Sequence, residues 1–363
     1  MLTYEIPLVP GPTRVPESVR QAYLTDYASA DLEPEYSQLY AEVQEQLRAI
    51  LSTGNQMAIM TGEGMIALWG ALKSCIRPGE RVLAVSTGVF GYGIGEMAAA
   101  IGAEVRWVEF GYDEIIRPAA VERALKDFRP KMVTAVHCET PSGTLNPVGL
   151  VGDLVRQYDV PLYYVDAVAS AGGAPVLTDA WGIDLCLIGN QKALSALPDL
   201  AAVAVSERAW ACIAQVNYAG YDALAPYREA LAKRWFPYTP AWASLAALHE
   251  ACRLVLDEGL AQVVARHARV AQRCRDRARE MGLRLYPSQE AGCSPTVTAL
   301  QVPESLGWEK LDRRLRERGM GVAGSLGPLA GRVFRIGHMG AQADVALVER
   351  GMDVLAQVLK EVA

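Results

Sequence analysis

Two polar residues stand where apolar runs end, and their types could support carbonyl chemistry. Lys192 follows the run Leu185–Gly189 in the segment Ile188-Gly189-Asn190-Gln191-Lys192, and Asp166 closes the run Leu162–Asp166. A lysine amine that loses its water becomes a nucleophile for carbonyl groups. A carboxylate can pair with a protonated pyridine nitrogen, which lets such a ring accept electrons. Alone, Lys192 would be a solvated lysine and Asp166 a helix cap; together at strand ends they indicate a pyridoxal site.

A glycine-rich turn, Thr61-Gly62-Glu63-Gly64-Met65, connects an apolar run to a segment with helical spacing. Backbone N–H groups at the start of a helix can bind an anion. The spacing Gly62-x-Gly64-x-x-Ala67 also imitates a dinucleotide fingerprint, which needs an acidic residue at the end of the next strand. That run ends in Ser86-Thr87. A nicotinamide-dependent dehydrogenase is therefore a weak alternative, and a binding protein without catalysis is a third reading that the pairing of Lys192 with Asp166 disfavours.

Three further segments carry side chains that could contact a ring or its substrate. Thr140 lies in Glu139-Thr140-Pro141-Ser142-Gly143-Thr144, whose hydroxyls could bond to a ring hydroxyl or form an ordinary turn. Arg335 stands between apolar neighbours and must find an anionic partner, either a substrate carboxylate or a structural salt bridge. Phe90 could stack on a flat ring, although core packing is the commoner role of a lone aromatic residue. The four histidines have no metal-ligand spacing, so we predict no metal site.

The elements that must position these residues alternate along the first two thirds of the chain. Short runs rich in Val, Ile and Leu alternate with helical patterns such as Ala119–Phe128 and Leu150–Tyr158. The runs are Gln56–Thr61, Val82–Thr87, Val105–Phe110, Met132–Glu139, Leu162–Asp166, Leu185–Gly189 and Leu200–Ser206. This alternation predicts an α/β fold with a mostly parallel seven-stranded sheet covered on both faces. Ligands of such sheets bind outside the carboxyl ends of the strands, where Asp166 and Lys192 stand.

From Leu245 onward the pattern has longer helices and fewer strands, which predicts a smaller α+β domain. The expected helices and strands are Leu245–Leu256, Gln262–Met281, Trp308–Arg318 and Val345–Val358, then Thr296–Val302 and Val333–Ile336. We therefore expect a large domain over residues 17–259 and a small C-terminal domain over residues 260–363, with residues 1–16 packed against the small one.

Composition excludes several classes of protein. The 363 residues carry a net charge of −6, and 51% are hydrophobic, which suits a folded chain and argues against nucleic acid binding. The seven cysteines are scattered in apolar runs without a CxxC pair, so we expect reduced core cysteines and a cytoplasmic protein. No stretch approaches the about 20 apolar residues that span a membrane, and the start shows no signal peptide.

Taken together and in this order, the motifs resemble the class V aminotransferases of fold type I. The resemblance runs from Pro10-Gly11-Pro12-Thr13 to Arg335-Ile336-Gly337. Two groups of that family stand out, the alanine–glyoxylate (serine–pyruvate) aminotransferases and the pyridoxamine–pyruvate aminotransferases. The resemblance implies pyridoxal 5′-phosphate as cofactor and a homodimer with shared active sites. It implies amino transfer between a small donor, such as alanine or serine, and a small 2-oxo acid, pyruvate or glyoxylate.

The resemblance assigns the chemistry to three residues. Lys192 would form the Schiff base with the pyridoxal ring and Asp166 would pair with the ring nitrogen, while Arg335 would clamp the substrate carboxylate. Lys192, once released, would move a proton between the substrate Cα and C4′, the aldehyde carbon of pyridoxal, as general base and acid. Because a single arginine in apolar surroundings offers nothing for a second charge, we expect the 2-oxo acid to be small.

The resemblance also implies which residues surround the ring and its phosphate. These residues are Glu63, Gly64, Met65, Phe90, Thr140, Val168, Gln191 and Thr239. Phe90 and Val168 would pack on opposite ring faces, and Thr140 would lie near O3′. Gln191 would contact the phosphate, and Thr239 would reach the phosphate of the partner subunit.

Glu63 is the most informative departure from the family pattern. The alanine–glyoxylate group has a small hydroxyl residue there, and a carboxylate would repel a dianionic phosphate. The pyridoxamine–pyruvate group carries a Gly-Glu pair and takes free pyridoxal and pyridoxamine as substrates, which is our alternative function. That group's second arginine, expected near Leu326, is absent, and Leu197-Pro198-Asp199 replaces the usual Pro-Pro-Gly without a reason in the sequence.

Cysteine desulfurase chemistry, which also occurs among the relatives of this family, is disfavoured. It needs a reactive cysteine, and none of the seven has an evident electropositive setting in the sequence. The sequence leaves open the amino donor, the choice between glyoxylate and pyruvate, and whether the bound ring is phosphorylated.

Overall fold

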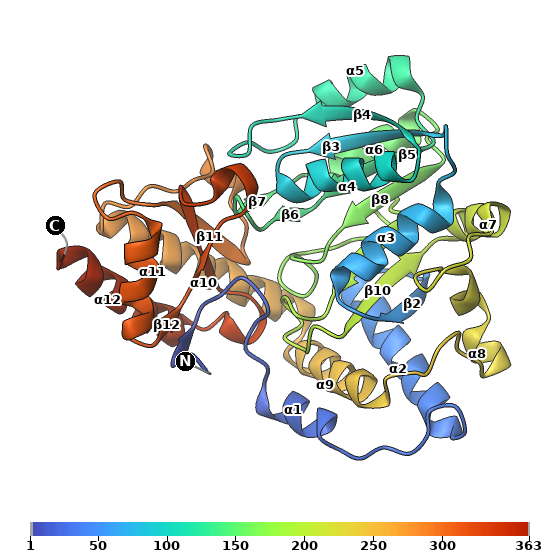
Figure 1. The fold of residues 1–363 in the computed structure, drawn as a ribbon, viewed down its shortest axis with the longest axis horizontal. Coiled ribbons are helices and arrows are strands. Elements are labelled where there is room, and N and C mark those ends of the chain that lie inside the picture. Colours follow the sequence, from blue (N-terminus) through green and yellow to red (C-terminus); the bar gives the residue numbers. More distant parts are fainter. Residues whose placement is uncertain (1–2, 362–363) are drawn as a thin grey trace.

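The computed structural model describes residues 3–361 and has a seven-stranded sheet at its centre (Figure 1). The strand order is β2-β10-β9-β8-β5-β3-β4, and the neighbouring strands are parallel except where β10 pairs with β2 and β9. The strands are β2 (Gln56–Thr61), β3 (Arg81–Ser86), β4 (Glu104–Glu109), β5 (Met132–Val136), β8 (Leu162–Asp166), β9 (Leu185–Gly189) and β10 (Leu200–Val205). The prediction of an α/β fold with a mostly parallel seven-stranded sheet is confirmed.

Helices cover both faces of this sheet, because successive strand residues point to opposite faces and both sets are apolar. Tyr163 and Val165 of β8 belong to the core of one face, whereas Leu162 and Tyr164 belong to the core of the other. The helices over the first face are α2 (Pro34–Leu51), α5 (Pro118–Phe128), α6 (Val148–Gln157) and α9 (Trp242–Glu258). Those over the second face are α3 (Gly64–Cys75), α4 (Val89–Ala100) and α7 (Glu207–Val216).

The predicted strand Met132–Glu139 is wrong in its second half, because the chain leaves the sheet at His137. β5 ends at Val136, and His137 donates its N–H to the carbonyl of Asp166 at 2.8 Å. Beyond it, β6 (Cys138–Glu139) pairs with β7 (Thr144–Leu145) as a short antiparallel hairpin. This hairpin brings Glu139 and Thr140 over the ends of β5 and β8.

Helix α4 lies between two of the predicted strands, where the alternation implies a helix, although its glycines at positions 91, 93 and 95 lower its helix propensity. Tertiary contacts override that propensity. A Cβ at Gly91 would lie 2.9 Å from the Cα of Ser86 and 3.3 Å from a carboxylate oxygen of Glu139. Glycine therefore lets the first turn of α4 approach the end of β3.

The C-terminal part has its own sheet and core. β11 (Val297–Gln301) and β13 (Ala323–Gly324) flank β14 (Val333–Gly337) in an antiparallel sheet, and the N-terminal β1 (Ile6–Pro7) pairs in parallel with β12 (Met320–Gly321). The helices here are α10 (Leu260–Glu280), α11 (Trp308–Glu317) and α12 (Val345–Lys360). Ile6 and Leu8 share an apolar core with α10–α12, beside which the N-terminus lies in Figure 1. The domain division at residue 260 stays a prediction.

The remaining described elements are short and lie in connections. They are α1 (Glu17–Tyr23), η1 (Ala225–Arg228), α8 (Ala230–Lys233), η2 (Glu290–Gly292), η3 (Gly327–Leu329) and η4 (Gly340–Gln342). The boundaries of the longer helices and strands that were predicted agree with the structure to within a few residues. Helix α9, for example, begins at Trp242, three residues before the predicted Leu245.

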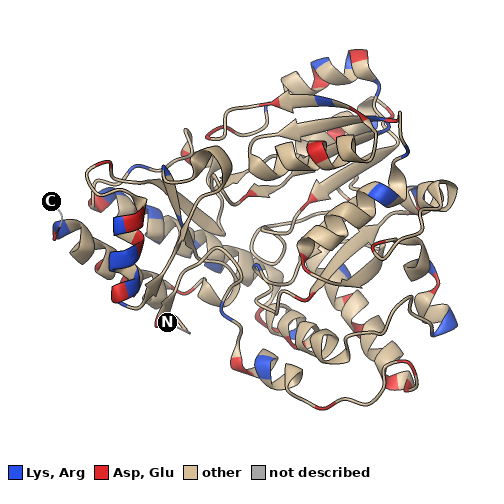
Figure 2. Ribbon diagram, viewed as in Figure 1, with Lys and Arg blue, Asp and Glu red and all other residues tan. Residues whose placement is uncertain are grey.

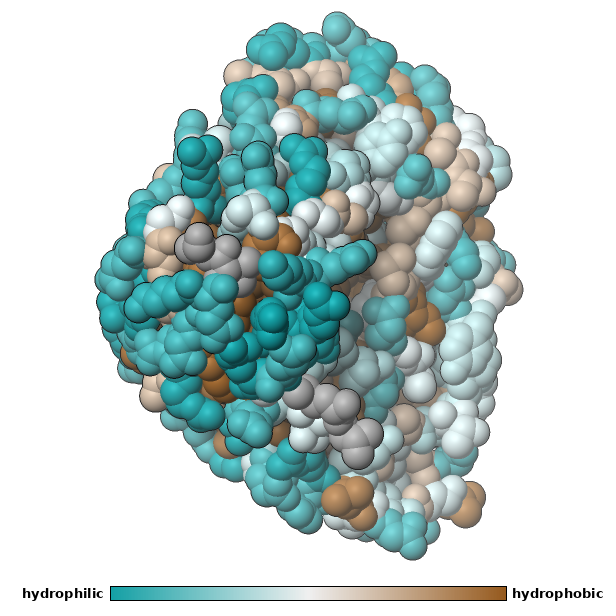
Figure 3. Space-filling model, turned by 60° about the vertical axis from the view of Figure 1, so that its left-hand side comes forward, coloured by the Kyte–Doolittle hydropathy of each residue, from teal (hydrophilic) through white to brown (hydrophobic). Residues whose placement is uncertain are grey.

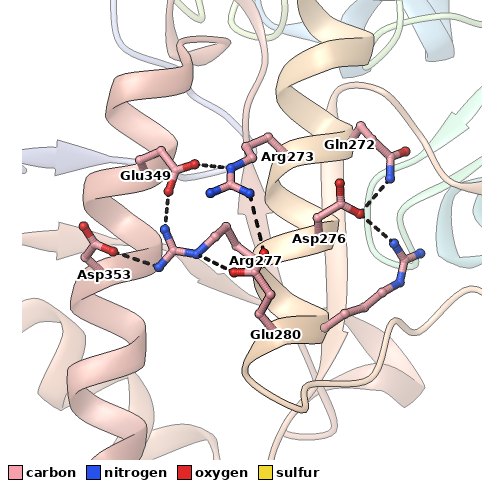
Figure 4. A network of polar contacts seen from close by, with 8 residues as sticks. Gln272, Arg273, Asp276, Arg277, Glu280, Glu349 and Asp353 are labelled. Carbon is pink, nitrogen blue, oxygen red and sulfur yellow. Dashed lines mark hydrogen bonds and ion pairs between the residues drawn. The ribbon is translucent and has the colours of Figure 1, made fainter.

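Charge is distributed unevenly over these elements. Outside β4, which carries Glu104, Arg106 and Glu109, the strands of the large sheet have few charged residues, whereas α10, α11 and α12 carry both signs, as is clearest along α11 (Figure 2). Where α10 and α12 meet, Arg273 and Arg277 both donate to Glu349, and Arg277 also donates to Asp353 at 2.8 Å (Figure 4). The face drawn in Figure 3 is mostly hydrophilic over this part, with hydrophobic residues in small separate groups. Among residues 3–361, no helix is both long and apolar enough to cross a membrane.

Candidate active site

A cavity of about 140 Å³ lies at the carboxyl ends of β8 and β9 and the start of α3. Its walls are formed by Glu63, Gly64, Met65, Leu68, Phe90, Cys138, Thr140, Asp166, Val168, Ala169, Gln191 and Lys192. Nine of these twelve residues were predicted from the sequence as site residues. The parallel strands bring them together, since the carboxyl ends of adjacent parallel strands share one edge of the sheet.

Lys192 is partly buried at this edge, and its amine points to the N-terminal segment. Its Nζ donates to the carbonyl oxygen of Pro10 at 2.7 Å. The next residue, Gly11, has a φ of +104°, and a Cβ there would lie 2.7 Å from Nζ. Burial, and then the nearby charge of Arg335, lower the pKa of Lys192 to about 8. A substantial share of the amine is therefore neutral, and nucleophilic, near neutral pH.

Asp166 is 5% exposed and ends β8 inside the cavity. Its Oδ1 accepts a hydrogen bond from the N–H of Val168 at 2.8 Å, so Asp166 caps its own turn, as the alternative interpretation of this residue required. Burial nevertheless raises the pKa of Asp166 to about 6, against the opposing effects of that N–H and of Lys192. A carboxylate in this state is stabilised by a cation placed against it.

Arg335 lies in β14, outside the residues that line the cavity, but close enough to influence the pKa of Lys192. It is 7% exposed, and both Nε and Nη2 donate to the carbonyl oxygen of Gly324, at 3.0 and 2.6 Å. Within residues 3–361 no carboxylate forms an ion pair with it, and burial lowers the pKa of Arg335 to about 10. The structural salt bridge that we considered for Arg335 does not occur in the described part of the chain.

The first turn of α3 presents backbone donors and a carboxylate to the cavity. Gly64 and Met65 are the first residues of α3, and Glu63, at the N-cap, makes no side-chain capping bond. Among the described residues Glu63 has no basic partner within ion-pair distance, so the salt bridge that could have turned it away from the cavity is not present. Glu63, Gly64 and Met65 all line the same cavity.

The segment Leu197-Pro198-Asp199, which had no explanation in the sequence, supports this turn. The carbonyl oxygen of Asp199 accepts the N–H of Gly62 at 2.7 Å, immediately before Glu63. The carboxylate of Asp199 accepts a hydrogen bond from Ser244 in α9 at 2.6 Å. Asp199 thus ties the start of α3 to a helix on the opposite face of the sheet.

Glu139 is fully buried, and it holds Phe90 against the cavity. One carboxylate oxygen accepts the N–H of Gly91 at 2.6 Å and the other accepts the N–H of Phe90 at 3.2 Å. Burial, with a smaller contribution from the charge of Asp166, raises the pKa of Glu139 to about 7 against the effect of those two hydrogen bonds. The sequence signal was present, because Glu139 directly precedes Thr140, but its partners on α4 were not foreseeable from spacing.

The structure leaves Thr239 away from the cavity of its own chain. Thr239 is exposed, and its neighbours Tyr238 and Pro240 line a separate small space with Thr61 and Ile66 at the end of β2 and the start of α3. Leu326 is 44% exposed, and the next residue, Gly327, lies near Val89 at the start of α4. Sequence reasoning missed the apolar wall of Leu68, Cys138 and Ala169, because small apolar residues carry no chemical signature.

Comparisons with known proteins agree with this geometry. Residues 9–333 match the aminotransferase class-V family. An uncharacterized aminotransferase of Methanocaldococcus jannaschii is 36% identical, with 98% of this chain and 96% of that protein covered. The pyridoxamine–pyruvate transaminase of Mesorhizobium japonicum is 34% identical, with 93% and 87% covered. The solved structure of an alanine–glyoxylate aminotransferase from Nostoc sp. matches with a TM-score of 0.94 at 31% identity, covering 99% of this chain and 96% of that one.

Proposed function

The chain belongs to the class V aminotransferases of fold type I, as its sequence predicted, and on that premise we propose that it moves an amino group between a small amino acid and pyruvate or glyoxylate. Alanine and serine are the expected donors. Pyridoxal 5′-phosphate is the proposed cofactor, held in a cytoplasmic homodimer whose subunits share their active sites.

The observation that carries the substrate class is Arg335. Its guanidinium is buried without a carboxylate partner among the described residues and lies near Lys192. Because a buried charge must find a counterion, a substrate carboxylate is its natural partner. Leu326 stands near the position expected for the second arginine of the pyridoxamine–pyruvate group. The site therefore offers one arginine for a carboxylate, which favours a small 2-oxo acid that has a single carboxylate.

The residues present fit a pyridoxal ring. Gln191 lines the cavity, and among residues 3–361 its buried Oε1 has no hydrogen-bond partner and the buried carboxylate of Asp166 forms no ion pair. Bound there, pyridoxal phosphate would supply an aldehyde that links to amines and a ring that accepts electrons. Asp166 would hold the ring nitrogen, Thr140 would bond near O3′, and Phe90 and Val168 would pack on its faces.

Lys192 has two tasks in this proposal. Its desolvated amine would be the attachment point for pyridoxal, and the same amine, once free, would move a proton between the substrate Cα and C4′, the aldehyde carbon of pyridoxal. The pKa of about 8 suits both tasks, because a proton carrier works best near the ambient pH. The carbonyl of Pro10, 2.7 Å away, gives the amine a fixed resting place while it is not attached.

Phosphate binding would use the N–H groups of Gly64 and Met65, the side chain of Gln191 and Thr239 of the partner. Glu63 opposes it, because its carboxylate faces the same end of the cavity without a basic partner in the described chain. That observation supports a second candidate function, pyridoxamine–pyruvate transamination. In that reaction the 5′ end of the ring carries a free hydroxyl group, which would donate a hydrogen bond to the carboxylate of Glu63.

The general proposal is tested by mass spectrometry of the purified protein after borohydride reduction. We expect the peptide that contains Lys192 to carry a reduced pyridoxyl group, and its mass shows whether the phosphate is present. Incubation with alanine should then convert the bound group to its amine form, and pyruvate or glyoxylate should reverse the conversion. A protein that binds no vitamer, or that exchanges no amino group with small acids, is not the enzyme proposed.

The two candidates separate on Glu63→Ser. If Glu63 faces the 5′ position, this change should tighten pyridoxal phosphate relative to pyridoxal by more than tenfold, provided that the repulsion exceeds ~1.4 kcal/mol. Glu63→Gln is the matched control, since it removes the charge and keeps the size. Equal preference in wild type and variants, with the phosphate favoured throughout, would eliminate the pyridoxamine–pyruvate candidate and leave the cofactor-bound enzyme.

A further inference from the structure

Away from the cavity, two cysteines meet where α3 and α7 pack together. Cys75 is the last residue of α3, and Cys212 lies in the middle of α7. The sulfur of Cys212 donates to the carbonyl oxygen of Cys75 at 3.3 Å, so the side chain of Cys212 reaches the residue that carries the other thiol. The positions are 137 residues apart in sequence, so no spacing motif announced the pair.

The two thiols differ in environment. Cys75 is fully buried, whereas Cys212 is only partly buried. The hydrogen bond from Cys75, and then the ammonium of Lys131, lower the pKa of Cys212. The same hydrogen bond, and then burial, raise the pKa of Cys75. The expectation that no cysteine has an electropositive setting is therefore wrong for Cys212, because Lys131 reaches it from the start of β5.

Lys131 is itself fixed in place. Its Nζ forms an ion pair with Glu80 at 2.6 Å, and both side chains are mostly buried. Glu80 opposes the effect of Lys131 on Cys212, but it ranks below the lysine among the influences on that thiol. Cys293, the other partly buried cysteine, differs, because burial raises its pKa and no sulfur partner lies beside it in the described chain.

We propose that Cys75 and Cys212 form a modification site, a dithiol that a hydroperoxide converts to a reversible disulfide, with Cys212 as the attacking sulfur and Cys75 as the resolving one. The residue that is partly exposed, Cys212, is the one that a small oxidant can reach, and its sulfur already lies against the backbone of Cys75 at 3.3 Å. A disulfide also requires the two side chains to turn toward each other within the narrow geometry of that bond.

The chemistry balances in two steps. The Cys212 thiolate attacks one peroxide oxygen, so that an S–O bond forms, the O–O bond breaks, and the leaving oxygen takes up a proton and departs as water or an alcohol. The sulfur is oxidised to sulfenic acid and the peroxide is reduced. The sulfur of Cys75 then attacks that of Cys212, the S–S bond forms, the S–O bond breaks, and hydroxide leaves as water with the proton of Cys75.

The cross-link would act on the helix that serves the cavity. Glu63–Met65 and Leu68 at the N-terminal end of α3 line the cavity, and Cys75 is at the C-terminal end of the same helix. A disulfide would join that end to α7 on the same face of the sheet. The site is nevertheless separate from the proposed transamination chemistry, so each proposal can fail without the other.

The test uses the full-length wild-type protein. It is treated with hydrogen peroxide, its free thiols are blocked with iodoacetamide, and it is digested without reductant. We expect a peptide that joins Cys75 to Cys212, lighter than its two parts by two hydrogen atoms, and lost on reduction. Without peroxide, Cys212 should be alkylated at neutral pH roughly tenfold faster than Cys293, because it is the more ionised thiol. Absence of that peptide, or alkylation of Cys212 no faster than that of Cys293, overturns the proposal.

Variants assign the two roles. Cys75→Ser should leave Cys212 as a sulfenic acid that dimedone labels, whereas Cys212→Ser should leave Cys75 unmodified. Cys293→Ser is the matched control and should keep the cross-link. If peroxide oxidises Cys75 in the Cys212→Ser protein as fast as it oxidises Cys212 in the Cys75→Ser protein, as measured by dimedone labelling, the assignment of the attacking sulfur is wrong. The wild-type peptide map decides the existence of the site even if a variant does not fold.

Discussion

Two groups of charged residues in this molecule are built on opposite plans. Around the cavity, Asp166, Glu139 and Arg335 are buried and Lys192 is partly buried, and none of the four has an ion pair among the described residues. Between α10 and α12, arginines and carboxylates lie near the surface and pair with one another (Figure 4). In the first group burial moves each pKa toward the uncharged form. In the second the partners move the pKa values of Arg273, Arg277 and Glu349 toward the charged form.

The difference between the two groups distinguishes charges expected to serve a ligand site from charges that stabilise the fold. A buried, unpaired charge costs free energy in the folded protein and is expected where a ligand supplies the missing partner. A paired, partly exposed charge adds a small stabilisation and gives no indication of a ligand. Changes in the cavity group should therefore affect activity strongly, while changes in the α10–α12 network should affect stability weakly.

The largest expected effect is that of Lys192→Ala. We expect transamination to fall to below roughly a ten-thousandth of the wild-type rate, because both the attachment point and the proton carrier are lost. The free energy of unfolding should not fall, because the substitution removes a buried ammonium. Turnover with alanine and pyruvate, together with thermal unfolding of the apo protein, provides the measurement.

Lys192→Arg is the control for the same position. It keeps a cation but cannot act as the nucleophile, so it should be as inactive as the alanine variant. Substantial turnover in either variant would mean that another residue supplies the catalytic amine. The contrast drawn between the cavity charges and the α10–α12 network would then lose its basis.

Arg335→Lys should have the next largest effect. The change keeps the charge and loses the planar fork that binds a carboxylate. We expect the apparent affinity for the 2-oxo acid to weaken by roughly 1.5–3 kcal/mol, the value of a charged hydrogen bond. Steady-state kinetics with varied pyruvate or glyoxylate measure it, and an unchanged KM would place the carboxylate clamp elsewhere.

Glu139→Gln should change the pH dependence of stability. The pKa of Glu139 is raised from 4.5 to about 7, so the folded protein binds a proton that the unfolded chain has released. The stabilisation is complete below pH 4.5 and is lost as the pH rises through 7. Asp166 and Tyr112 also face this carboxylate, so the variant must be compared with wild type. Denaturant unfolding of the apo proteins across this pH range should show that wild type loses roughly 1–3 kcal/mol of unfolding free energy and that Glu139→Gln loses less. If the free energy of unfolding changed equally with pH in the two proteins, Glu139 would be ionised in the folded state.

Much of this arrangement was predictable from the sequence, because strand patterning and strand ends are local signals. The seven apolar runs became the seven strands, and the turn at Glu63, the end of β8 and the end of β9 met at one cavity. Lys192 and Asp166 were found in this way, since each directly follows or ends an apolar run. The roles of these residues stay predictions, because burial and proximity do not identify a reaction.

Features that depend on distant contacts were not predictable. The carbonyl of Pro10 meets Lys192 across 182 positions, and Asp199 supports Gly62 through a single backbone hydrogen bond. Neither contact leaves a pattern in the residues between. The carboxylate of Glu139 that receives the first N–H groups of α4 is likewise 48 or 49 positions away, so the support it gives to that helix leaves no local pattern.

Glu349→Gln in the α10–α12 network is expected to have the smallest effect, and its pH dependence has the opposite sign to that of Glu139→Gln. Hydrogen bonds from Arg273 and then Arg277 lower the pKa of Glu349, against a smaller effect of burial. Its stabilisation is therefore present above pH 4.5 and is lost as the pH falls through the lowered pKa.

The effect of Glu349→Gln should be small, because both arginines are near solvent and Arg277 keeps its ion pair with Asp353. We expect the free energy of unfolding to fall by about 1 kcal/mol or less at neutral pH, less at high salt, with turnover unchanged. Denaturant unfolding at low and high ionic strength, at pH 7 and pH 4, measures it. If the loss were large, insensitive to salt, or accompanied by reduced turnover, the network would be coupled to the cavity and the two groups of charges would not be separable.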